Sequence, residues 1–207
     1  PADSASDFDS DGDFQDYVEK NDKPPHWDAV LAARPSLLQF WYRQSPDTMV
    51  ASDFRDNMLT PGIVTRTDPP TTLSGMINLD LDPQGRLTYF QAIPPQKVED
   101  KSDATTPRPF DWNILFSAAG LDPSKFQTTQ PTWTSLAQSD SRMAWTGTWP
   151  GTTRPLRVEA ATFQGKPVFF SLIGDWTKPQ RMITTEKKTI GQKISRIFGL
   201  ALLVSLL

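Results

Sequence analysis

The chain contains no cysteine among its 207 residues. This absence excludes a disulfide framework, a thiolate zinc site, an iron–sulfur cluster and a cysteine nucleophile. It does not identify the cellular compartment, because a chain without cysteine is compatible with oxidising and with reducing surroundings. Histidine is nearly absent as well, and His26 is the only one. Any chemistry that depends on histidine must therefore use this one residue.

The chain also lacks an excess of charge of one sign. Its 21 Lys and Arg against 24 Asp and Glu give a net charge of −3, with both signs mixed along the sequence. Binding of nucleic acid needs a basic face, so we expect no nucleic-acid partner. By contrast, 12 Phe and 7 Trp make the chain too aromatic for a disordered protein, and 19 Pro indicate short elements joined by long loops.

Long hydrophobic runs are missing except at the end of the sequence. Ile197–Leu207 carries no charge but is shorter than the roughly 20 residues that cross a bilayer. We therefore interpret residues 194–207 as a truncated transmembrane segment, through which Ile194–Leu207 would attach the chain to a membrane. Residues 178–193 before it form a basic linker. The other end, Pro1–Ser4, has neither an initiator methionine nor the features of a signal peptide, and we interpret it as cut too.

Two passages resemble each other at an offset of 80 residues. Gln84–Ile93 aligns with Gln164–Ile173, with aromatic residues at the same places. Apolar and polar residues alternate before each passage, which is typical of half-buried strands, so each passage predicts a β-hairpin. The first turn, Asp82–Gly85, has Asp first, Pro second and Gly fourth, as a type I turn prefers. In the second copy, Gly165 keeps the permissive backbone position.

Helix signals precede both hairpins. In the first copy, Phe14, Tyr17 and Val18 form an apolar stripe, and a second short helix is expected from Trp27 to the break at Pro35. In the second copy, a helix is expected from the candidate N-cap Asp111 to Gly120.

These signals predict an α+β fold. We expect a tandem repeat of a helix packed on a three- or four-stranded antiparallel sheet, followed by the start of a transmembrane helix. The first helix-plus-sheet repeat would span residues 1–97 and the second would span residues 98–177.

Several stretches resemble one recurring bacterial region: Phe40–Pro46, Leu79–Leu87, Ala144–Gly147 and Leu156–Ala161. That region lies C-terminal to the kinase domain of certain membrane-bound serine/threonine protein kinases, between membrane spans. The resemblance covers nearly the whole chain, although the matching stretches encode strands and turns and no chemistry. The helix-plus-sheet repeat also resembles PepSY-type modules more loosely. The resemblance implies an extracytoplasmic domain that serves signal transduction as a sensor or interaction module.

No kinase residue can be carried over to this chain. The sequence contains no Gly-rich phosphate loop, no His-Arg-Asp catalytic loop and no Asp-Phe-Gly. One observation favours the opposite membrane orientation, because basic residues on a flank tend to stay in the cytoplasm and six of them precede the apolar run: Lys178, Arg181, Lys187, Lys188, Lys193 and Arg196. The tendency compares both flanks of a span and only one is present, so we retain the extracytoplasmic placement at the cell membrane.

The best candidate for a metal site lies near the start of the chain. Asp7, Asp9 and Asp11, followed by Gly12, fit the opening of an EF-hand calcium loop. Such a loop needs a bidentate acid at its twelfth position, where the chain has Val18. The alternative is an acidic helix start, in which carboxylates are favoured by the helix dipole. We favour the helix start and expect no metal or other cofactor, with the three aspartates as the calcium candidates.

Candidates for catalysis are few. A nucleophile that depends on His26 would need an acid and a hydroxyl nearby, and nothing in the sequence places them there. Asp80 and Asp82 lie two residues apart on an expected strand and could mimic an acid pair. The turn explains Asp82 better, and Asp80 is expected to face water. We predict no catalytic residue, and that this chain is not an enzyme.

Tryptophan provides the remaining signal. Five tryptophans could line a groove for a sugar or peptide, although packing under the sheets is the favoured interpretation: Trp41, Trp133, Trp145, Trp149 and Trp176. The leading hypothesis is therefore a non-catalytic sensor or interaction domain with an unknown ligand or protein partner. A membrane-tethered hydrolase is the alternative, and would show a cleft with converging polar groups. A structural spacer without ligand would show none.

Overall fold

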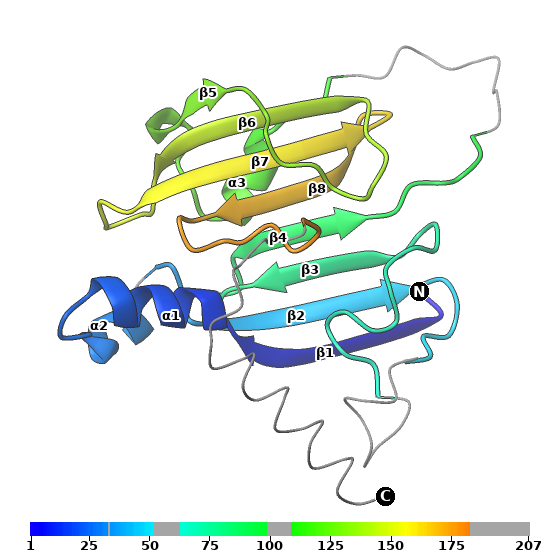
Figure 1. Ribbon diagram of the computed structural model, residues 1–207. Helices are drawn as coiled ribbons and strands as arrows, with labels where there is room; N and C mark the ends of the chain where they lie inside the picture. Colours follow the sequence, from blue (N-terminus) through cyan, green and yellow to red (C-terminus); the bar gives the residue numbers. More distant parts are fainter. Residues whose placement is uncertain (33, 52–62, 99–108, 183–207) are drawn as a thin grey trace, which may run out of the picture. The chain divides into compact units, whose positions relative to one another are not determined.

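The computed structural model describes residues 1–32, 34–51, 63–98 and 109–182. Pro1–Thr177 form one compact unit, whose described residues build a single antiparallel sheet of eight strands (Figure 1). The spatial order is β1-β2-β3-β4-β8-β7-β6-β5. The strands from the first half of the unit therefore occupy one side of the sheet, and those from the second half occupy the other.

The strand bounds follow the alternating sequence patterns. The first side consists of β1 (Asp3–Ser10), β2 (Leu38–Ser45), β3 (Ile77–Leu81) and β4 (Leu87–Ala92). The second side consists of β5 (Gln127–Thr129), β6 (Ser141–Thr148), β7 (Pro155–Phe163) and β8 (Lys166–Ile173). Both predicted hairpins are present, as β3–β4 and β7–β8. At the first turn, the Gly85 amide donates to the Asp82 carbonyl at 2.8 Å, as a tight turn requires.

The two sides of the sheet join where β4 pairs with β8. Phe90 lies directly opposite Phe170, and these residues are related by the same offset as the two similar passages. Each hairpin also leaves one residue of its last strand unpaired, Thr88 in β4 and Val168 in β8, at that same offset. The hairpins are thus alike in backbone as well as in sequence.

The helices lie where the apolar stripes predicted them. α1 (Gly12–Asn21) begins after Asp11, whose carboxylate accepts the Phe14 amide at 3.0 Å. α2 (Trp27–Ala32) and α3 (Asn113–Ala118) follow, with a short 3₁₀ turn η1 (Pro123–Lys125). Gly120 has a φ of +59°, a conformation that glycine adopts without strain and that stops α3.

The main core lies on one face of the sheet. Alternate residues of β7 and β8 pack there against α1, α2 and α3: Leu156, Val158, Ala160, Phe170 and Leu172 meet Phe14, Val18, Val30, Leu115 and Phe116. Figure 1 shows α3 behind β6–β8, and α1 and α2 at one end of β1 and β2. Burial of these aromatic and aliphatic side chains is the main source of stability.

Two long connections cover the opposite face, each held by a buried charge. On the first side, Arg43 of β2 is 1% exposed and donates to the Thr65 carbonyl at 2.6 Å and to the Pro69 carbonyl. On the second side, Glu159 of β7 is 1% exposed and accepts the amides of Thr132 at 2.8 Å and Trp133 at 3.2 Å. In each connection, a buried charged side chain thus forms hydrogen bonds with main-chain groups that take no part in strand pairing.

The expected tandem of two separate helix-plus-sheet repeats is wrong, because the strands form one continuous sheet. An exposed strand edge attracts further pairing, and β4 and β8 satisfy each other's edges instead of ending two sheets. The expectation also missed β1, which precedes α1 and pairs with β2 along its whole length. The predicted transmembrane segment, residues 194–207, lies outside the described residues. Among the described residues, the structure has no helix with the length and apolar character needed to cross a membrane.

Candidate functional site

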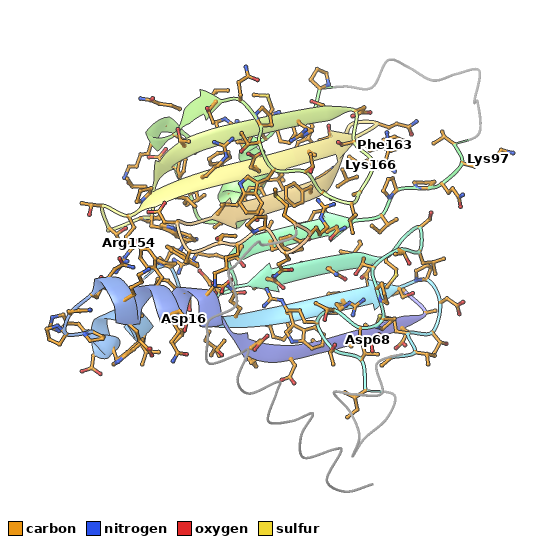
Figure 2. All side chains as sticks on the ribbon, viewed as in Figure 1. Asp16, Asp68, Lys97, Arg154, Phe163 and Lys166 are labelled. Carbon is orange, nitrogen blue, oxygen red and sulfur yellow. The ribbon has the colours of Figure 1, made fainter. Side chains whose placement is uncertain are left out.

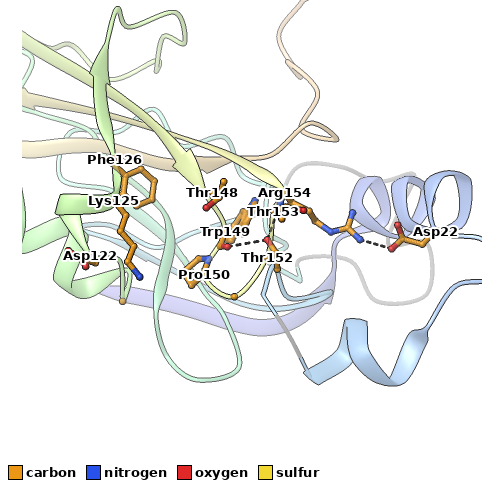
Figure 3. Close-up of a pocket in the computed structure, with 12 residues that line it drawn as sticks. Asp22, Asp122, Lys125, Phe126, Thr148, Trp149, Pro150, Thr152, Thr153 and Arg154 are labelled. Atoms are coloured by element: carbon orange, nitrogen blue, oxygen red, sulfur yellow. Dashed lines mark hydrogen bonds and ion pairs between the residues drawn. The ribbon is translucent and has the colours of Figure 1, made fainter.

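An open hollow of about 970 Å³ lies on the unit formed by Pro1–Thr177 (Figure 3). Its walls come from the end of α1, the α3–β5 connection and the β6–β7 loop. The lining residues are Asp22, Gly120, Asp122, Lys125, Phe126, and Thr148 to Arg154. Segments that are far apart in the sequence therefore build one concave surface, because the joined sheet places both sides of the unit next to each other.

The β6–β7 loop that forms one wall is held by its own hydrogen bonds. The Trp149 amide donates to the Arg154 carbonyl at 3.0 Å, and the Thr152 amide donates to the Trp149 carbonyl at 3.0 Å. The Thr152 hydroxyl donates to the same Trp149 carbonyl at 3.1 Å. Gly151 at the tip has a φ of +77°, which favours glycine. The wall is therefore ordered by local geometry.

Arg154 fixes the hollow to α1. Its guanidinium lies 2.5 Å from the carboxylate of Asp22, the C-cap residue of α1 (Figure 3). It also lies over the ring of Tyr17, 5.5 Å from the centroid, and 6.0 Å from that of Phe14. Cation–π contacts of this kind contribute about 0.5–1 kcal/mol at exposed sites. Arg154 is thus already occupied by Asp22 and by two aromatic rings.

The opposite side of the hollow carries a second acid and a second base. Asp122 caps η1, accepting the Ser124 amide at 3.0 Å and the Ser124 hydroxyl at 2.7 Å. Both hydrogen bonds lower the pKa of Asp122, and the bond from the Ser124 hydroxyl has the larger effect. Lys125 follows in the same turn and is exposed, and no carboxylate of the described residues lies within ion-pair distance of it.

Trp149 separates the hollow from a smaller cavity of about 50 Å³. Its side chain is buried and stacks on Trp176, with ring centroids 5.9 Å apart. Arg34 lies over it on another side, 5.8 Å from the ring. Among the described residues, no acceptor lies within hydrogen-bond distance of Trp149 Nε1. A buried donor without a partner is uncommon, so this wall of the hollow contains an unsatisfied hydrogen-bond donor within the core.

A buried ionic cluster closes the smaller cavity. Asp82 accepts a charged hydrogen bond from Arg86 at 2.7 Å and lies 3.6 Å from Arg34. Arg34 also donates to the carbonyls of Ala119 at 2.9 Å and Gly120 at 3.3 Å, which end α3. Burial, and then the nearby Arg86, lower the pKa of Arg34, whereas Asp82 opposes this shift. The cluster ties the β3–β4 turn to α3 and so supports one wall of the hollow.

The structure separates the three calcium candidates. Asp7 and Asp9 belong to β1, where their carboxylates accept the amides of Phe8 at 2.7 Å and Ser10 at 2.8 Å. Asp11 caps α1, and also accepts the Trp176 indole N–H at 3.3 Å. The residues therefore form a strand and a helix cap in place of a calcium loop. Within the described ranges, no group of three or more potential ligands could hold a metal ion.

The catalytic candidates are also apart from the hollow. His26 is exposed just before α2. Asp80 is buried on the face covered by residues 63–75, at 2.5 Å from Arg66, so the expectation that it faces water is wrong. Burial raises the pKa of Asp80, although the Arg66 charge and its hydrogen bond oppose the shift, and Asp9 and Asp11 add to it. Asp82 belongs to the turn and the ionic cluster described above.

The tryptophans are divided between core and partly exposed positions. Trp41, Trp149 and Trp176 are buried, and Trp133 and Trp145 are half-buried. Trp145 packs on Trp112 and Phe116, so it extends the main core. Among the five, only Trp149 lines the hollow. Sequence reasoning missed Asp22, Asp122, Lys125 and Arg154, since single charged residues in separate turns give no local signal of a shared site.

Comparisons of the chain with protein-family models, with curated proteins and with solved structures found no match. The resemblance to regions of membrane-bound kinases therefore stays a prediction from the sequence. Function has to be argued from the geometry of the hollow and its walls.

Proposed function

We propose that Pro1–Thr177 is a non-catalytic sensor or interaction domain, and that the hollow receives its ligand. The observation behind this proposal is the hollow itself, with a volume of about 970 Å³. Sites for small molecules commonly measure about 300–1,000 Å³ and combine apolar walls with a few placed polar groups. The hollow has both, with Phe126 and Pro150 beside Lys125 and the threonines of the β6–β7 loop.

The chemistry of the hollow supports binding over hydrolysis. Its two carboxylates, Asp22 and Asp122, are each engaged by a partner. Asp122 is exposed and its pKa is lowered further from the ordinary value, so the group is ionised near neutral pH and is poorly suited to donate a proton. His26 does not line the hollow, and neither does Asp80. The hydrolase alternative gains no support from this arrangement.

The cellular setting is part of the proposal and rests on the sequence alone. Attachment to a membrane through Ile194–Leu207 would place this domain at the cell surface, outside the cytoplasm. The resemblance to membrane-bound kinases suggests a serine/threonine kinase domain in the parent protein. The sequence of the full-length gene tests this setting, because a complete short gene without a kinase domain would contradict it.

A thermal-shift screen of the full chain against a library of small molecules tests the proposed binding function. A ligand present at 100 times its dissociation constant adds about 2.7 kcal/mol of stability, which raises the melting temperature of a chain of this size by about 5–10 °C. We expect Thr153→Trp, which places a large ring in the hollow, to abolish the shift. The matched control Thr128→Trp, an exposed β5 residue outside the hollow, should retain it. A spacer predicts no shift with any compound.

A further inference from the structure

The hollow contains equal numbers of acidic and basic side chains, but the two kinds are not equally available. Asp22 is bound by the guanidinium of Arg154 at 2.5 Å. Asp122 accepts two hydrogen bonds from Ser124. Asp22 is therefore occupied by its neighbour, whereas Asp122 receives both bonds on Oδ1 and keeps an exposed Oδ2.

The donors of the hollow are less occupied than the acceptors. The side-chain ammonium of Lys125 is exposed and forms no ion pair or hydrogen bond with the described residues, although its charge contributes to the lowered pKa of Asp122. The main-chain amides of Gly151 and Thr153, at the tip of the β6–β7 loop, have no acceptor within the described part of the chain either. Lys125 and Pro150, which precedes that loop tip, both line the hollow (Figure 3). A cation and two main-chain N–H groups thus border the same concave surface.

Groups of this kind recognise oxyanions. Hydrogen bonds in which one partner is ionised are shorter and about twice as strong as those between neutral groups. Successive main-chain N–H groups in a turn with a left-handed glycine form concavities that bind anions. Gly151 supplies the left-handed conformation with its φ of +77°, and the amide of Thr152, which lies between the two unpaired amides, is held by the Trp149 carbonyl.

Resting on the proposed function, we infer that the hollow binds a small organic ligand through a carboxylate or phosphate group. Lys125 and the amides of Gly151 and Thr153 hold the oxyanion. The half-buried Phe126 and the Pro150 ring contact the remainder of the ligand. Arg154 stays with Asp22 and positions the loop wall, and is not the anion's main partner.

The test titrates the full chain with four probes and follows its amide chemical shifts. Glutarate and glutaramide share a carbon skeleton, but only glutarate carries carboxylates. Inorganic phosphate separates the two oxyanion sources, and 1,5-diaminopentane tests the opposite charge. We expect glutarate, phosphate or both to shift the Gly151 and Thr153 amides, with an affinity that falls as salt is added. Binding by one oxyanion and not the other identifies the group.

Variants of one exposed lysine assign the contact. Lys125→Met should weaken oxyanion binding at least about tenfold, the loss expected when a charged hydrogen bond is removed. Lys125→Arg keeps the charge and should largely restore binding. Lys166→Met is the matched control, since Lys166 is also exposed and lies at the other end of the second hairpin from Arg154 (Figure 2).

Two results would overturn the inference and leave the proposed function standing. The first is that glutaramide or 1,5-diaminopentane changes the amide chemical shifts of the hollow as strongly as glutarate does. The second is that Lys125→Met binds oxyanions as tightly as the unchanged chain. The absence of any oxyanion binding would also overturn it. In that case the library screen, which includes neutral and cationic compounds, decides the proposed function separately.

Discussion

Substituting Phe170 by alanine should destabilise both sides of the sheet. Phe170 is 0% exposed and lies opposite Phe90, at the only place where β4 and β8 bring the two sides together in the described sheet. Complete burial of a phenylalanine side chain contributes about 1.5–3 kcal/mol, and the cavity left by truncation adds to the loss. We therefore expect Phe170→Ala to lower the free energy of unfolding by about 3–5 kcal/mol.

Hydrogen exchange measured peptide by peptide gives the sharpest assay for this substitution. If the sheet unfolds as one cooperative unit, protection should fall by the same free energy in β2 and in β7, although only β7 neighbours the substituted strand. The matched control Phe8→Ala removes the same ring from β1, where it is 59% exposed, and should cost less than about 1 kcal/mol. Unchanged protection of β2 in Phe170→Ala would refute the continuous sheet as a single folding unit.

Substitutions at three further positions test particular contacts, each by urea unfolding. Trp149→Phe removes a buried N–H without a described partner and also part of a buried ring, so it should cost about 1–2 kcal/mol from lost packing alone; a cost above about 3 kcal/mol would mean that the N–H is satisfied in solution. Glu159→Ala leaves Arg157 and two amides without their buried acceptor and should cost about 3 kcal/mol or more, whereas Glu159→Gln should cost less; equal effects would argue against the role of the charge. Asp80 has a raised pKa when folded, so it takes up a proton more readily in the folded state, and its contribution to stability declines as pH rises from its ordinary value of 3.8. The stability of Asp80→Asn relative to the unchanged chain should therefore increase with pH over that range, and a constant difference would contradict the burial of this carboxylate.

Local features of the fold could be predicted from the sequence because short-range chemistry determines them. Asp82 and Gly85 define a turn, and the apolar stripe of Phe14 and Val18 defines a helix, whatever lies around them. The pairing of β4 with β8 has no such signal. Both strands show the same alternation whether they end a small sheet or join a large one, so the sequence predicted two sheets.

The connection that covers the sheet face opposite the main core explains why the expectation for Asp80 failed. Asp80 alternates with the apolar residues of β3, which normally places a side chain in water. Arg66, 14 residues earlier in the connection between β2 and β3, covers it instead. The hollow escaped prediction for the same reason, because Asp22, Lys125 and Arg154 approach one another only after the sheet has joined.

Binding in the hollow is tested most directly by a map of amide chemical shifts in the full chain. The titrant is the compound that gives the largest thermal shift in the library screen. We predict that the shifted amides gather on Gly120, Lys125 and the loop from Thr148 to Arg154. The opposite result would contradict binding in the hollow: the shifted amides gather around Phe8 of β1 and Leu38 of β2, which are exposed apolar residues, and the amides of the hollow do not change.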